Sequence, residues 1–69
     1  MDPRKIRALL VERGIKITTI ARDLGITQPS VSLVISRNSR SYRVEKEISE
    51  RLGKPYEQLW GAEPRRRAA

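Results

Sequence analysis

The chain has 69 residues, no cysteine and no histidine, and its net charge is +7. Disulfides, most zinc sites and the usual nucleophile triads are therefore excluded, and we expect no catalytic residue, no metal and no cofactor. The positive charge indicates a polyanionic partner, or it serves solubility alone.

Apolar runs are short throughout the sequence. No window approaches the roughly 18 apolar residues of a membrane helix, and the apolar run in MDPRKIRALL is too short for a signal peptide. We therefore expect a cytoplasmic protein with no membrane contact. The chain is also too short for an added sensor domain, so we expect no small-molecule ligand.

A glycine separates the first two predicted helices. Asp2 caps the first helix and Pro3 starts it, since Pro loses no hydrogen bond there. Gly14 ends this helix. Its apolar stripe holds Ile6, Leu9 and Leu10. The buried face of the second helix holds Ile17, Ile20, Ala21 and Leu24, and Gly25 follows it.

The third predicted helix begins at Thr27, carries Pro29 in its first turn and has three apolar residues on its inner face. These are Val31, Val34 and Ile35. The polar run SRNSRS, residues 36–41, predicts a loop because nothing in it can be buried.

Two more helices complete the prediction. The fourth buries Val44, Ile48 and Leu52, places Glu45 on a solvated mixed-charge face and ends at Gly53. The fifth opens at Lys54-Pro55 and anchors Tyr56, Leu59 and Trp60 in the core, or it presents Tyr56 and Trp60 at a surface shared with a second copy. We therefore predict an all-α, five-helix domain over residues 1–60. A flexible basic tail follows over 61–69, and Arg65–Arg67 in it either reach DNA or only solubilise the chain.

Residues 17–35, ITTIARDLGITQPSVSLVI, carry the functional signal. Ala21 stands four residues before Gly25, and Val31 and Val34 stand six and nine after it. Two short helices joined by a tight glycine turn cross steeply, and a small residue lets them approach closely. This spacing is typical of a helix-turn-helix.

The stretch resembles the helix-turn-helix of the phage lambda-repressor and Cro family, and GITQPSVSLVI is similar to the second helix of lambdoid repressors. KPYEQLW resembles the small Ner-type phage regulators. The resemblance implies a five-helix, lambda-repressor-like domain that binds operator DNA as a homodimer, as a small phage or prophage repressor in the bacterial cytoplasm and nucleoid. That family often has Gln at the start of the helix before the recognition helix, where this chain has Ile17 and Thr18.

Matched by position, the family's base-reading sites fall on Gln28, Pro29, Ser32 and Leu33. Helical geometry agrees in part, because an inward Val31 turns Pro29, Ser32 and Leu33 outward. Gln pairs with adenine, Ser contacts most base edges, and Pro and Leu meet thymine methyl groups. Three alternatives stay open: Gln28 as a polar first-turn residue, Pro29 as a helix starter, and Leu33 in contact with another protein chain.

Hydroxyl, amide and guanidinium groups around the third helix form a predicted phosphate clamp. No acidic residue stands between Asp23 and Glu45, as expected of a segment that lies against phosphates. The predicted clamp residues are Thr18, Thr19, Thr27, Ser30, Arg37, Asn38, Arg40 and Arg43.

The sequence therefore predicts a transcription regulator that binds double-stranded DNA sequence-specifically. The alternative is a protein-binding module on the same fold, such as the antitoxin of a toxin pair or an adaptor. An enzyme such as a small nuclease is disfavoured, because the acidic residues are scattered and form no metal-binding cluster.

Overall fold

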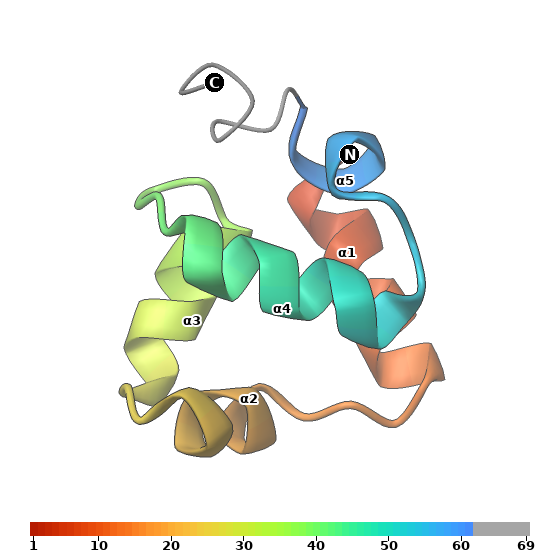
Figure 1. Cartoon of the computed structure of the whole chain (residues 1–69). Coiled ribbons are helices and arrows are strands. Elements are labelled where there is room, and N and C mark those ends of the chain that lie inside the picture. Colours follow the sequence, from red (N-terminus) through yellow and green to blue (C-terminus); the bar gives the residue numbers. More distant parts are fainter. Residues whose placement is uncertain (62–69) are drawn as a thin grey trace.

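Five helices make up most of residues 1–61, the part of the chain that the computed structural model describes (Figure 1). They are α1 (Pro3–Glu12), α2 (Ile17–Leu24), α3 (Gln28–Ile35), α4 (Tyr42–Leu52) and α5 (Tyr56–Trp60). No strand occurs in this range. The predicted all-α, five-helix class is confirmed. Residues 62–69 of the predicted tail lie outside the described residues.

Side-chain caps define where three of the helices begin. Asp2, Thr27 and Ser41 each accept a hydrogen bond from a backbone N–H in the first turn of α1, α3 and α4, at 2.8, 3.4 and 3.4 Å. A helix start leaves such N–H groups without backbone partners, so these caps stabilise the ends. The predicted caps at Asp2 and Thr27 are confirmed, and Ser41 adds a third.

The core is built from apolar residues of all five helices, and α4 runs across the molecule in front of it (Figure 1). The predicted anchors Tyr56, Leu59 and Trp60 are buried, so they are core residues. None of the helices within residues 1–61 is long and apolar enough to cross a membrane. The buried apolar residues are Ile6, Leu10, Ile20, Ala21, Val31, Val34, Ile35, Val44, Ile48, Leu52, Tyr56, Leu59 and Trp60.

The left-handed residue that follows α3 is an arginine, whereas the left-handed residues that follow α2 and α4 are glycines. Arg37 has a φ of 65°, in the left-handed region that Gly25 and Gly53 occupy after α2 and α4. Its N–H donates to the carbonyl of Val34 at 3.1 Å, and the N–H of Asn38 donates to the carbonyl of Leu33 at 3.0 Å. Such a conformation costs a non-glycine residue about 1–3 kcal/mol, so other contacts of Arg37 must offset it.

Glu45 is buried, with 1% of its surface exposed, and the prediction of a solvated Glu45 is wrong. Its carboxylate accepts hydrogen bonds from the hydroxyl of Tyr56 at 2.5 Å and from Nε of Arg40 at 2.7 Å. Its carbonyl accepts from Trp60 Nε1 at 2.9 Å. A buried charge is tolerated only with such partners, and these come from the α3–α4 loop and from α5. Sequence periodicity shows none of them.

We expect Tyr56→Phe to lower the free energy of unfolding by about 1–3 kcal/mol, because the buried carboxylate of Glu45 loses one of its donors. Urea denaturation followed by circular dichroism measures the change. Gln58→Ala, an exposed position on the same helix, is the control and should change stability by less than about 0.5 kcal/mol. Equal effects of the two substitutions would remove the hydroxyl of Tyr56 from the stabilising contacts.

The same contact makes stability depend on pH. Burial and the hydrogen bond to Glu45 raise the pKa of Tyr56 from 10.0 to about 12. Because the folded-state pKa lies above that of the unfolded chain, the stabilisation is complete below about pH 10 and is lost as the pH rises toward 12. Over that interval the wild type should lose more free energy of unfolding than Tyr56→Phe, and parallel losses would contradict this cause.

Candidate functional site

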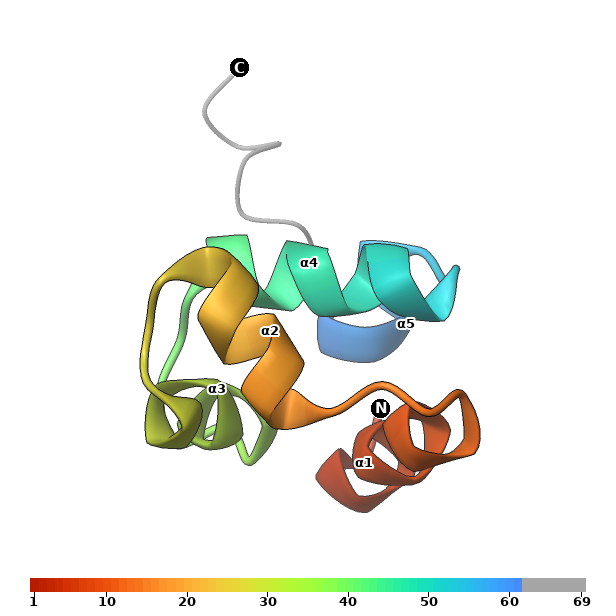
Figure 2. The ribbon, with the colours of Figure 1, turned by 90° about the horizontal axis from the view of Figure 1, so that it is seen from below.

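Helices α2 and α3 lie against each other and form the predicted helix-turn-helix (Figure 2). Ala21 is buried, and the backbone N–H of Ile26 donates to its carbonyl at 2.9 Å. Gly25, at a φ of 70°, supplies the left-handed turn between the two helices. The small side chain of Ala21 and the tight turn together determine which face of α3 is left open.

The open face of α3 carries no charged side chain. Gln28, Pro29 and Leu33 are exposed, and Ser32 is half-buried. Leu33 keeps 46% of its surface exposed, so this face presents an apolar side chain as well as polar ones. The four predicted base-reading residues therefore share one accessible, uncharged surface of a single helix.

Arg7 of α1 also reaches this surface, and the sequence analysis did not single it out. Its Nη2 donates to Oγ of Ser32 at 3.0 Å and to the carbonyl of Ser32 at 3.5 Å. The two residues stand 25 positions apart, so no local spacing connects them. Arg7 directly follows the buried Ile6, and the apolar spacing of the first helix gives no signal for a contact with α3.

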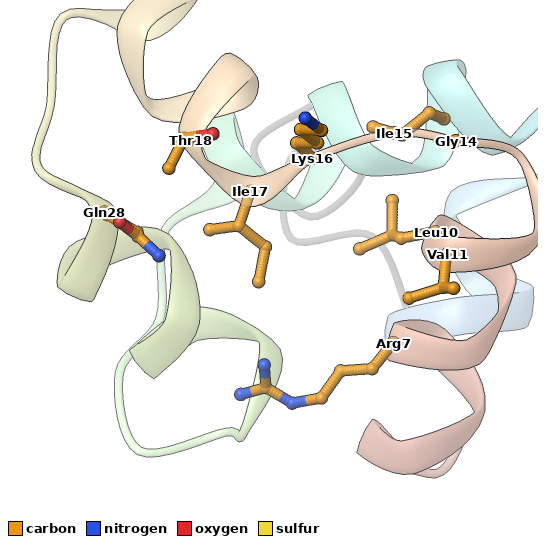
Figure 3. A pocket seen from close by; sticks show the side chains of 9 residues that line it. All are labelled: Arg7, Leu10, Val11, Gly14, Ile15, Lys16, Ile17, Thr18 and Gln28. Atoms are coloured by element: carbon orange, nitrogen blue, oxygen red, sulfur yellow. The ribbon is translucent and has the colours of Figure 1, made fainter.

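A groove between α1, α2 and α3 brings Thr18 and Gln28 together at its rim (Figure 3). Lys16 and Arg7 line it as well, and no acidic residue of the described range 1–61 does. In Figure 3 the side chain of Arg7 extends from α1 toward α3 across the bottom of the groove. The full lining is Arg7, Leu10, Val11, Gly14, Ile15, Lys16, Ile17, Thr18 and Gln28. An anion beside Gln28 would therefore meet only neutral and positive groups.

The hydroxyl groups of the predicted clamp differ in what they contact. Thr27 and Ser30 bond to each other through their side-chain oxygens at 2.8 Å, at the exposed start of α3. Thr18 is exposed at the start of α2, and Thr19 is half-buried beside it. The first turns of both helices are thus accessible, and their backbone N–H groups favour anions.

Arg37 is held by contacts within the fold. Its Nη2 donates to the carbonyls of Met1 at 2.9 Å and Leu59 at 2.8 Å, and its guanidinium lies 5.7 Å from the ring centre of Trp60. These contacts offset the cost of its left-handed backbone and connect the end of α3 to α5. They account for Arg37 without any ligand.

The remaining predicted clamp residues follow α3 in the loop and in α4. Arg40 pairs with the buried Glu45, and the amide of Asn38 donates to Oγ of Ser36 at 3.3 Å. Arg43 is exposed and donates to the carbonyl of Leu24 at 3.1 Å, which places it beside the end of α2. Within residues 1–61, Arg43 is the one of the three predicted arginines that bonds neither to a carboxylate nor to α5.

Residues 1–61 contain no group of three or more side chains that could hold a metal ion. The site consists of hydrogen-bonding and apolar groups on α3, with positively charged side chains beside them.

A protein-family model described as winged helix-turn-helix DNA-binding matches residues 1–66. No curated protein and no solved structure matches the chain. The match supports a helix-turn-helix family without selecting the lambda-repressor, Cro or Ner-type groups. Since residues 1–61 form helices and no strand, the helix-turn-helix is the part of that description which they contain.

We expect Ala21→Leu to separate α2 from α3 and to lower the free energy of unfolding by about 1–3 kcal/mol, because the larger side chain overfills a closed contact. Ala8→Leu, at an exposed position of α1, is the matched control and should have little effect. Urea denaturation of both variants measures the difference. A tolerated Ala21→Leu would mean that close approach does not hold the two helices.

Proposed function

Because the chain belongs to the winged helix-turn-helix DNA-binding family, we propose that it is a transcription regulator that binds double-stranded DNA sequence-specifically with α3 in the major groove. It has no catalytic role in this proposal. The observation that carries the proposal is the open face of α3, which is polar or apolar but uncharged, while the positive groups lie at its sides.

This division matches what DNA presents. Base edges are read by hydrogen bonds and by apolar contacts with thymine methyl groups, so an uncharged helix face suits them. In this proposal Gln28 would pair with adenine, and Ser32 and Leu33 would extend the contact along the helix. Leu33 would meet either a thymine methyl group or a second protein chain.

Phosphates would lie beside the reading helix. The accessible helix starts at Thr18 and Thr27 supply backbone N–H groups, and Arg43 supplies a forked guanidinium next to the end of α2. Such contacts release bound counterions, so affinity falls steeply as salt increases. Arg37 and Arg40 support this surface by holding the loop that joins α3 to α4.

In its most specific form the proposal is a small phage or prophage repressor of the lambda-repressor and Cro type. It would bind its operator as a homodimer in the bacterial cytoplasm and act by occupying the site against polymerase or another regulator. A dimer predicts two half-sites about one helical turn apart in sequences selected from random DNA.

We expect Gln28→Ala to relax the preference at one operator position by about 10-fold and to leave binding to random duplex DNA nearly unchanged, because a bidentate base contact discriminates by roughly 1–3 kcal/mol. Selection from random DNA followed by sequencing measures this. Gln58→Ala, an exposed glutamine on α5, is the control. A uniform loss over all positions would assign Gln28 to the fold or to the DNA backbone.

We expect Arg43→Ala to reduce the slope of log affinity against log salt by about one unit, as one phosphate contact is lost. Lys5→Ala removes the same charge from the α1 surface near Gln58, and it should leave the slope unchanged. Fluorescence anisotropy with random duplex DNA over a salt series gives both slopes. A wild type that fails to bind at low salt, or binds independently of salt, would instead favour a protein-binding module.

A further inference from the structure

The contact between Arg7 and Ser32 restricts what Ser32 can offer to a ligand. A guanidinium has hydrogen-bond donors and no acceptor, so Oγ of Ser32 must accept from Nη2 of Arg7 at their 3.0 Å separation. A serine hydroxyl has one hydrogen and two lone pairs. With one lone pair directed at Arg7, the hydroxyl hydrogen of Ser32 points elsewhere. The second lone pair is a weaker acceptor, because the bond from the guanidinium draws electron density from Oγ and strengthens the hydroxyl as a donor.

No group within residues 1–61 accepts that hydrogen. A helical serine commonly donates to a carbonyl in the preceding turn, as Ser36 does to Ser32 at 3.0 Å and Ser49 does to Glu45 at 2.9 Å. Ser32 makes no such bond within residues 1–61, where its Oγ bonds to Arg7 alone. Its hydrogen is therefore available at the half-buried edge of the open face of α3.

The other serines near this face differ from Ser32. Ser36 donates its hydrogen to the helix backbone, and Ser30 shares a hydrogen bond with Thr27. Arg7 itself forms no ion pair with any carboxylate in the described part of the chain, so its full charge stays beside Ser32. The combination of a fixed acceptor side and a free hydrogen occurs at Ser32 alone among these three serines.

We propose that Arg7 is a positioning residue that makes Ser32 a hydrogen-bond donor toward DNA, so that Ser32 selects a base edge with an acceptor. This inference rests on the proposed function, because it assumes that Ser32 faces a base. The acceptors in the major groove are N7 and O6 of guanine, N7 of adenine and O4 of thymine, whereas cytosine offers only its amino group. A serine without Arg7 would contact donors and acceptors alike.

The first test compares sequence preferences. Binding sites are selected from random DNA with the wild type and with Ser32→Ala. The operator position whose base preference is lost in Ser32→Ala is the position that Ser32 faces. Arg7→Met removes the donors at similar length, and it should reduce the preference at that same position about 10-fold while leaving the others unchanged. Arg7→Lys should retain the preference, because an ammonium also only donates.

The matched control is Lys5→Met, which removes one charge from the same helix and should leave every preference unchanged. The proposal is overturned if Arg7→Met weakens binding evenly at all positions, since Arg7 would then act through its charge. It is also overturned if Arg7→Lys loses the preference, since donation to Ser32 would then not explain the effect of Arg7. If no sequence is enriched by the wild type, the proposed function fails, which is a different result.

A second measurement needs only the wild type and Ser32→Ala, so it remains decisive if Arg7→Met does not fold. Base analogues that lack N7, O6 or O4 are placed one at a time in the pair that Ser32 faces, and anisotropy measures the affinity. One of them should weaken wild-type binding about 10-fold and leave Ser32→Ala unaffected. If only an analogue without the amino group weakens binding, or if none does, Ser32 is not a donor and the proposal is wrong.

Discussion

The structure depends on one constraint: α3 has eight residues and must keep one face open, yet a helix of this length is not stable by itself in water. Its helical conformation must come from the groups packed around it. Val31, Val34 and Ile35 bury the inner face, and Thr27 caps the start. Most of the remaining fold can be understood as support for this helix.

Two arginines supply support that the apolar core does not. Arg7 holds the side of α3 through Ser32, and Arg37 holds its end through two distant carbonyls and Trp60. A third, Arg40, pairs with the buried Glu45 and so connects the loop after α3 to α4 and α5. Charge in this protein thus serves the fold at several positions, in addition to the polyanionic partner or the solubility that an overall charge of +7 suggests.

The open face of α3 and its surroundings carry different chemistry for a physical reason. Base edges are discriminated by hydrogen bonds and apolar contacts, whereas phosphates attract positive charge without regard to sequence. In this molecule the two kinds of group are separated, with Gln28 and Leu33 on the helix and Lys16 and Arg43 outside it. The proposed function follows from that separation together with the family match.

Local patterns in the sequence determined the five helices, the caps at Asp2 and Thr27, the turn at Gly25 and the inner face of α3, because each depends on residues within one or two helical turns. Tertiary structure alone decided the burial of Glu45, the left-handed Arg37 and the contact of Arg7 with Ser32. The bonds of Glu45 with Tyr56, of Arg7 with Ser32 and of Arg37 with Met1 join residues 11 to 36 positions apart, and helical periodicity carries no information over such separations. Hydropathy places a long charged side chain on the surface, but only the folded arrangement shows which backbone or carboxylate groups lie within its reach.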